Sequence, residues 1–266
     1  MKFKYDHDFH IHSFLSNCSG DPTQTPENIL KYAKEFNLKQ ICLTDHFWDE
    51  DVLGASNWYD KHHKFIQISK SLPLPKDDEV KFYFGAETDL DKNCKLGITK
   101  KRFDAFDFVI IPTTHLHMKG FTITDEDYNN PKRIAKLWGE RTNAVLDMDL
   151  PFYKIGLAHL ACDLMCNPFE RYLEVLDLIP TDDMYKVFKK ASEKGVGIEL
   201  NGGDLLEFEK SKDNLLRMFG IAKECKCKFY LGTDCHTQNR FVELSKNFEL
   251  TIDLLGLEES DKFKIK

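Results

Sequence analysis

Residues 108–115 read Phe-Val-Ile-Ile-Pro-Thr-Thr-His, and this stretch shows the pattern on which the fold depends. Its first five side chains are apolar and three of them are β-branched. Short runs of this kind, bounded by polar residues, indicate β-strands. His115 follows the run by three residues, so it lies just beyond the carboxyl end of the predicted strand. The same order, an apolar run and then a polar side chain, recurs along the chain.

Seven such runs are separated by segments in which apolar residues recur at helical spacing. Thr25-Pro26-Glu27 predicts a helix start, because a hydroxyl cap, a proline at the first helical position and an acid in the first turn all favour one. Pro131 opens a second helix, and Thr181 opens a third that ends near Gly195. The predicted strands are Phe9–His12, Gln40–Thr44, Val80–Ala86, Phe108–Pro112, Ile155–Ala158, Val196–Leu200 and Lys228–Gly232.

Strands that alternate with helices predict a parallel sheet and an α/β fold. No linker rich in proline, glycine or serine interrupts the seven units, so we expect one domain over residues 1–266. Seven units without a break favour a closed or nearly closed barrel. An open doubly wound sheet is the alternative, since the pattern alone does not exclude it.

Histidines and carboxylates follow the ends of these strands. His10 and His12 face one side of the first strand because side chains two apart point the same way, and Asp234 and His236 form a second such pair. Polar residues beyond successive parallel strands converge, and a convergent His/Asp/Glu cluster is what a multi-metal site needs. The residues concerned are His10, His12, His46, Glu87, His115, His159, Asp234 and His236.

The remaining histidines are left out of this cluster. His62 and His63 are predicted to lie within a helix and to be solvated. His7 precedes the first strand and receives no role. His117 is the alternative to His115, either as the ligand itself or as a partner of the ligand.

Taken together and in this order, the motifs resemble those of the PHP family, named for polymerase and histidinol phosphatase domains. The resemblance spans residues 10–236, which is most of the chain. It implies a distorted (β/α)7 barrel of the TIM-like kind, with two to three divalent metal ions (Zn, Mn or Fe) at the carboxyl ends of the strands. The matching pieces are His10-Ile11-His12, Thr44-Asp45-His46, Gly85-Ala86-Glu87, His115, His159 and Asp234-Cys235-His236.

Carried over by position, the resemblance implies three metal positions, of which the third departs from the family pattern. His46 and His236 would hold that ion with one more ligand from the loop after the first strand, where the family has His or Asp and this chain has Cys18. A thiolate binds zinc or iron well. Cys18 therefore remains a candidate ligand, with Asp21 as the alternative. The first ion would be held by His10, His12, Glu87 and Asp234, and the second by Glu87, His115 and His159.

The resemblance implies a phosphoesterase that hydrolyses a small phosphomonoester, with histidinol phosphate as the best single guess, by attack of a hydroxide that bridges the metals. Asp45 is predicted to orient a metal-bound imidazole. Arg240 is the candidate cation for the phosphate, and Lys119 is a second one. The alternatives are a PHP-type nuclease or phosphodiesterase and a non-catalytic metal-binding protein of the same fold. A hydrolase of C–N bonds with a similar histidine-rich barrel is a further alternative, although its usual barrel lysine has no obvious candidate at a strand end here.

The overall composition limits the classes of partner that we expect. A net charge of −7 argues against nucleic acid, and no apolar segment predicts a membrane partner. With no apolar segment at the start of the chain either, we expect a cytoplasmic protein. The eight cysteines then indicate reduced thiols. The sequence gives no sign of the oligomeric state.

Overall fold

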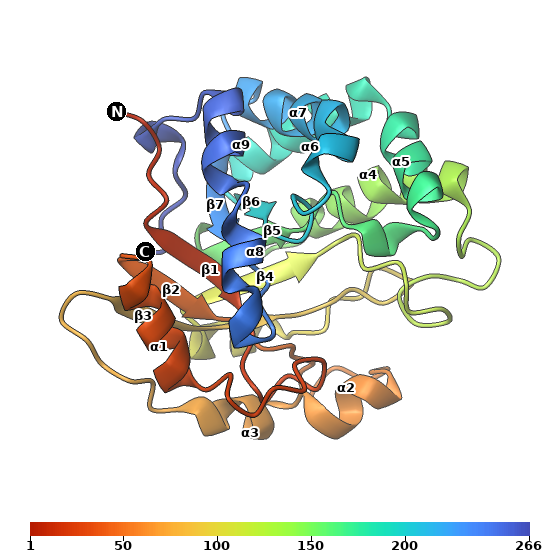
Figure 1. Cartoon of the computed structure of the whole chain (residues 1–266). Helices are drawn as coiled ribbons and strands as arrows, with labels where there is room; N and C mark the ends of the chain where they lie inside the picture. Colours follow the sequence, from red (N-terminus) through yellow and green to blue (C-terminus); the bar gives the residue numbers. More distant parts are fainter.

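The computed structural model describes residues 1–266 and contains one seven-stranded sheet. Each strand pairs in parallel with the next one along the chain, in the order β1 to β7. Figure 1 shows the strands at the centre, with helices on both sides of them. The strands are β1 His7–Ile11, β2 Gln40–Leu43, β3 Lys81–Glu87, β4 Phe108–Pro112, β5 Ile155–Ala158, β6 Gly197–Asn201 and β7 Lys228–Gly232.

The seam between β1 and β7 nearly closes the sheet into a barrel. Two backbone hydrogen bonds cross it just past the strands, from Asp234 N to the His10 carbonyl (2.7 Å) and from His12 N to the Cys235 carbonyl (3.0 Å). Between β1 and β7 themselves, a side chain takes the place of a backbone hydrogen bond: the Leu231 amide donates to His7 Nε2 at 3.0 Å. The prediction of a nearly closed barrel is therefore confirmed, and the alternative of an open sheet is not. His7, which received no role from the sequence, helps to join β1 to β7.

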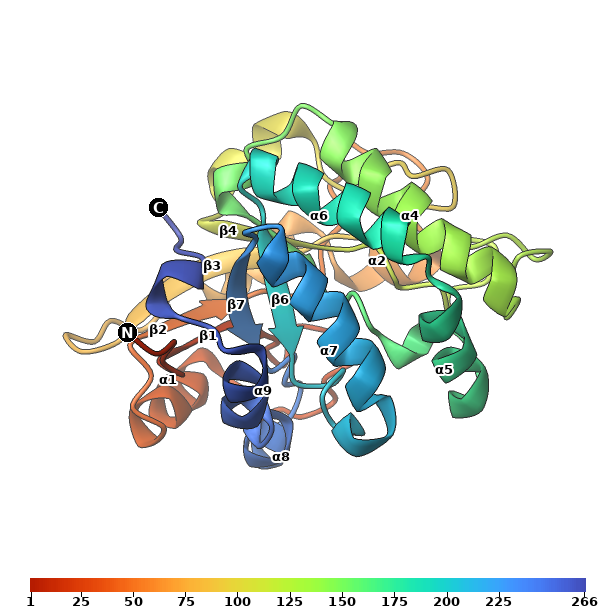
Figure 2. The ribbon, with the colours of Figure 1, turned by 90° about the horizontal axis from the view of Figure 1, so that it is seen from above.

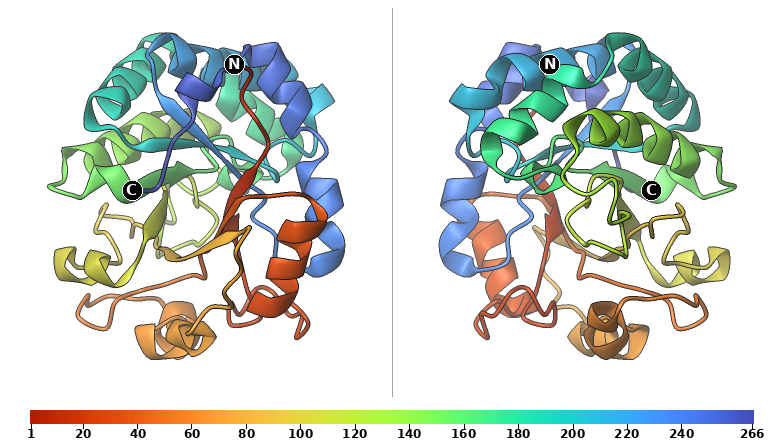
Figure 3. Two further views of the ribbon diagram at one scale, coloured as in Figure 1. Left: turned by 90° about the vertical axis from the view of Figure 1, so that its left-hand side faces the viewer. Right: turned by 90° about the vertical axis from the view of Figure 1, so that its right-hand side faces the viewer.

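Helices surround this ring, as the view from above and the two side views show (Figures 2 and 3). The longest ones, α4 and α7, run beside α5 and α6 on one side, while α1, α2 and α3 lie on the opposite side (Figure 1). The helices are α1 Pro26–Glu35, α2 Asn57–His62, α3 Phe65–Ile68, α4 Pro131–Asp147, α5 Phe169–Leu178, α6 Thr181–Lys194, α7 Phe208–Glu224, α8 Phe241–Ser245 and α9 Phe248–Leu255.

The predicted helix signals are present in the structure. Thr25 caps α1 by accepting a hydrogen bond from the Asn28 amide, and Pro26 occupies the first turn. Gly195 ends α6 in the left-handed conformation, with φ of 73°. Glycine adopts this conformation without the steric cost that a side chain brings, which is why the helix ends there.

Apolar residues fill the barrel interior below the strand ends. Phe9, Phe108 and Tyr230 lie there together, and the C-terminal residues Phe263 and Ile265 pack against them. The Phe263 amide donates to the Phe229 carbonyl at 2.7 Å, which fixes the tail across this end of the barrel. With one end filled, the polar residues of the opposite end remain open to a ligand. No helix of the structure has the length and apolar character that crossing a membrane requires.

Candidate metal centre

The histidines and carboxylates expected from the sequence meet at the carboxyl ends of the strands. His10 and His12 bring their Nε2 atoms within 3.1 Å of each other. Asp234 Oδ1 lies 3.3 Å from His10 Nε2 and 3.1 Å from His12 Nε2. One carboxylate oxygen thus faces two imidazole nitrogens, which is a ready set of ligands for one cation.

Glu87 is shared by most of the cluster. Its Oε2 lies 3.2 Å from His12 Nε2 and 2.9 Å from His46 Nδ1. Its Oε1 lies 3.1 Å from His159 Nε2 and 4.0 Å from His115 Nε2. The two oxygens therefore face different histidines, as a carboxylate that bridges two metal ions would.

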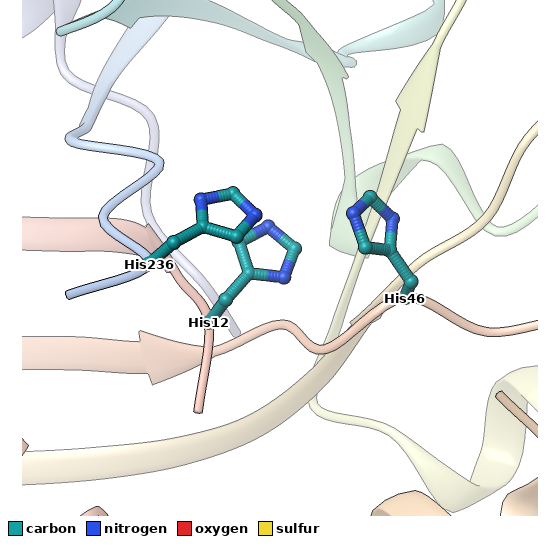
Figure 4. A group of neighbouring side chains, drawn as sticks. All are labelled: His12, His46 and His236. Carbon is teal, nitrogen blue, oxygen red and sulfur yellow. The ribbon is translucent and has the colours of Figure 1, made fainter. Parts of the chain in front are cut away.

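Another group combines His12, His46 and His236, whose ligand atoms all lie within 4.8 Å of one another. Figure 4 shows the rings of His12 and His236 side by side with His46 across from them. The rings of His12 and His236 are stacked, with centroids 4.1 Å apart. Cys18 lines the cavity that opens over these residues, but it belongs to no such group. The alternative, Asp21, accepts hydrogen bonds from Thr23 and from the Gln238 amide instead.

Carboxylates also support the histidines from behind. Glu199 on β6 lies 2.8 Å from His10 Nδ1, and Asp89 lies 3.1 Å from His115 Nδ1. Such contacts fix the tautomer and the orientation of an imidazole, so that the other nitrogen faces the metal. The sequence analysis missed both residues. Asp89 carried a signal, because it stands two residues after Glu87 and so continues the same face of the strand.

Asp45 acts on His12 through a serine. Ser16 Oγ donates to Asp45 Oδ1 at 2.7 Å and lies 3.0 Å from His12 Nδ1. Because the hydroxyl donates to Asp45, it accepts the proton of His12 Nδ1, which leaves Nε2 free for a metal. Asp45 makes no direct bond to an imidazole, and it also holds the Ser13 amide and hydroxyl. That Asp45 orients a metal-bound imidazole stays a prediction, and the structure indicates that it would act on His12 through Ser16.

Charges within the cluster shift the pKa values of its histidines. Burial lowers the pKa of His12, but contacts with Asp234 and Glu87 outweigh burial and raise it to about 9. Burial likewise opposes Asp89, which raises the pKa of His115 to about 9. In His236, burial and the neighbouring charge of His12 lower the pKa to about 3. A cation that binds here must therefore displace protons from some imidazoles and meets others already neutral.

The donor set fits divalent cations. Glu87 Oε2 and His46 Nδ1 are buried without a hydrogen-bond partner, although they lie 2.9 Å apart. His159 Nδ1 is buried and unpartnered as well. Buried polar atoms are ordinarily satisfied, and nitrogen and carboxylate donors together suit zinc, manganese and iron. The cluster is therefore built to bind metal.

The PHP domain family matches residues 8–203. The chain belongs to this family. Membership makes it a metal-dependent phosphoesterase, a hydrolase of phosphate esters, as the motifs implied. No curated protein matches the chain in sequence.

Two solved structures share the PHP fold of this chain. One is a histidinol phosphate phosphatase from Lactococcus lactis subsp. lactis Il1403, complexed with zinc, L-histidinol and phosphate. It is 19% identical, with a TM-score of 0.64 over 97% of this chain and 98% of that one. The other is a putative histidinol phosphatase from Listeria monocytogenes, 13% identical, with a TM-score of 0.64 over 91% and 99% of the two chains. At these identities the likeness establishes the fold.

Two positions of the PHP site have strained backbones. His159 has φ of 33° and Asp234 has φ of 56°. Residues other than glycine seldom adopt these values, and they persist where the surrounding structure holds them. Here the Asp234 amide donates to the His10 carbonyl, and the His159 amide donates to Glu199 Oε2 at 2.8 Å. The strain thus falls on two of the expected ligands.

A cavity of about 570 Å³ opens over the cluster. His117 lines it without joining any of the close ligand groups, whereas His115 groups with His159. Lys119 also lines the cavity, whereas Arg240 is not among the lining residues and pairs with Glu243 on the surface, with Nε 3.2 Å from Oε2. The lining residues are Cys18, His46, Ser56, Asn57, Trp58, Glu87, Asp89, His115, His117, Met118, Lys119, Phe121, Leu164, Asp234 and His236.

Two further residues differ from the sequence analysis. The prediction that His63 is solvated within a helix was wrong, because α2 ends at His62 and the His63 side chain is fully buried. Cys162 is a buried thiol that groups with His115 and His159, with ligand atoms within 4.8 Å. It follows β5 in the same turn as His159, so its spacing of three residues was the available signal.

Proposed function

We propose that the protein hydrolyses a small phosphomonoester, with histidinol phosphate as the first substrate to test. The observation that carries this proposal is the position of Glu87, whose two oxygens face two different sets of histidines. A pair of adjacent sites joined by a carboxylate suits phosphate-ester hydrolysis. Divalent ions bound there would lower the pKa of water and neutralise charge on the phosphoryl oxygens.

The residues of the chain supply binding and orientation. Glu199 and Asp89 hold His10 and His115 in place, and Ser16 holds His12, so these nitrogens are oriented before a ligand arrives. Lys119 lines the cavity, and its ammonium group is the candidate positive charge for the phosphate. The solved relative with zinc, L-histidinol and phosphate supports the choice of first substrate.

The test combines metal analysis with a substrate panel. Protein purified without chelator should carry about two to three divalent ions per chain, by analogy with the family. The protein, supplied with manganese, zinc or iron, is then assayed with histidinol phosphate, other phosphomonoesters, a phosphodiester and a short oligonucleotide. We expect turnover of phosphomonoesters. Turnover of the oligonucleotide alone would assign the nuclease function instead, and a protein that binds metal but turns over nothing would be non-catalytic.

A further inference from the structure

Trp58 stands at the edge of the metal cluster and lines the cavity above it. It lies on α2, one residue from the buried Tyr59. Its ring centroid is 5.0 Å from that of His46, with the two planes at 74°. Trp58 is half-buried, whereas the other two tryptophans, Trp48 and Trp138, are fully buried. A large planar side chain therefore borders the space into which a substrate must enter.

His63 holds this tryptophan in place. The imidazole packs against the indole with ring centroids 3.9 Å apart. His63 Nε2 accepts a hydrogen bond from the Asn17 amide at 3.1 Å, so the proton is on Nδ1, which donates to the Trp58 carbonyl at 3.3 Å. Burial and the charge of His46 lower the pKa of His63 to about 3. The imidazole is neutral at ordinary pH and ties Trp58 to the loop after β1.

Three other residues that line the cavity are apolar, whereas Ser56, Asn57 and Lys119 are polar. Phe121, Met118 and Leu164 line the cavity together with Trp58. The carboxylates that line it are already engaged: Asp89 bonds His115, while Glu87 and Asp234 face the histidines of the metal cluster. The cavity thus has a charged, metal-binding floor, and above it lie apolar side chains, one indole plane and the side chain of Lys119.

We propose that Trp58 forms a stacking surface for a planar part of the substrate's leaving group. The proposal rests on the proposed phosphomonoesterase function, since the phosphoryl group would lie over the cluster and the alcohol portion against Trp58. Aromatic pairs gain affinity beyond that from buried area, by about two- to twelvefold in binding. Planarity, rather than apolar size alone, is then what the site selects.

Two phosphonates that resist hydrolysis separate these properties. Benzylphosphonate and cyclohexylmethylphosphonate have similar size and the same anionic group, but only the first has a planar ring. Their affinities for the metal-loaded protein are measured by calorimetry. We expect benzylphosphonate to bind about two- to twelvefold more tightly. It should also change the tryptophan fluorescence, because Trp58 is the one tryptophan that is not fully buried.

Variants assign the preference to the indole. Trp58→Leu should abolish the preference for benzylphosphonate, and Trp58→Phe should keep most of it. Leu53→Ala is the matched control, because Leu53 lies in the preceding loop, is 81% exposed and does not line the cavity. Metal content is measured for every variant, so that loss of the cluster is not mistaken for loss of stacking.

His63 is tested as a positioning residue. His63→Ala should lower the preference for the planar phosphonate, and His63→Gln should restore part of it, because the amide oxygen can still accept from Asn17. Equal binding of the two phosphonates by the wild-type protein, or an unchanged preference in Trp58→Leu, would overturn the proposal. Hydrolysis of phosphomonoesters is scored separately: stacking without hydrolysis would refute the proposed function alone, and hydrolysis without stacking would refute this inference alone.

Discussion

Glu87 is fully buried, and its pKa shows how the cluster is balanced. Burial opposes its negative charge, but the charges of His46 and His10 outweigh burial and hold the pKa of this carboxyl well below its ordinary value. Glu87→Gln keeps the size of the side chain and removes the charge. We expect metal content and activity to fall together, activity by more than about 100-fold. Elemental analysis and phosphatase assays check this.

The control for that variant is Glu193→Gln on the exposed face of α6, which should leave both quantities unchanged. If Glu87→Gln retained near wild-type activity, the view that this carboxylate joins two metal sites would be wrong.

Glu199 acts on the metal site indirectly, by holding the His10 imidazole. Glu199→Gln weakens the contact with His10 Nδ1 by removing its charge, so we expect metal affinity to fall by about 10- to 100-fold. Excess metal should restore much of the activity, which a merely unfolded variant would not show. Metal titration with activity as the second readout tests this, and full activity at limiting metal would contradict it.

The two thiols near the site can be told apart with cobalt. A cysteine thiolate bound to Co²⁺ gives a near-ultraviolet charge-transfer absorption that imidazole and carboxylate ligands do not. Because Cys162 groups with His115 and His159, we expect Cys162→Ser to remove this absorption and Cys18→Ser to keep it. Loss of the absorption in Cys18→Ser would instead support the role expected for that residue from the sequence.

At the residue scale, the sequence predicted which histidines and carboxylates converge, because their positions depend only on where strands end. Every expected histidine and carboxylate reaches the cluster. Cys18, whose place depends on the path of a loop, joins none of the close groups. Glu199 was hidden for a different reason. It stands inside an apolar strand, where a single carboxylate gives no sign of its partner until β1 and β6 are placed around the ring.

At the scale of elements, β7 must pass very close to the cluster. A side chain at Gly232 would place its Cβ 2.1 Å from Glu199 Oε1 and 2.5 Å from His10 Cβ. Gly232→Ala should therefore displace the Glu199–His10 pair, lower metal affinity and destabilise the fold by about 1–3 kcal/mol. Thermal unfolding and metal titration measure the two effects.

Gly220 on α7 provides the matched control, because nothing lies within 4 Å of a Cβ added there. Gly220→Ala should be neutral or slightly stabilising, since alanine favours a helix. Equal behaviour of the two variants would mean that the close approach of β7 has no effect on the site.

Strand positions were predicted within one or two residues, and four strands shifted slightly. The first strand begins two residues earlier and departs from regular pairing between Asp8 and Ile11. Such irregularities depend on neighbouring strands and leave no local trace. The same holds for His63. The local pattern predicted that the helix continues, but α2 ends at His62, and the His63 ring packs against the indole of Trp58.

At the scale of the molecule, the cluster links pH to stability. In the metal-free protein the raised pKa values of His12 and His115, about 9, stabilise the fold fully below pH 6.5 and lose that contribution as pH rises towards 9. The lowered pKa of His236, about 3, acts in the opposite sense, and its contribution is lost as pH falls from 6.5 towards 3. The stabilising contributions of these three groups are therefore together largest near pH 6.5 in the metal-free protein.

Metal affinity should follow a different course, rising between pH 6.5 and 9 as protons leave His12 and His115. Denaturant unfolding of chelator-treated protein and metal titration across pH 5–9 measure the two curves. Proton release on metal binding at pH 7, detected by calorimetry in buffers of different ionisation enthalpy, provides an independent check. An affinity that does not change with pH would contradict the assignment of protons to these imidazoles.

The seam between β1 and β7 brings residues from opposite ends of the chain to one point. His10 and His12 precede Asp234 and His236 by more than two hundred residues in the chain. A growing chain therefore holds only part of the expected ligand set until residue 236 has been made. We expect complete loading with metal to follow the synthesis of all seven strands.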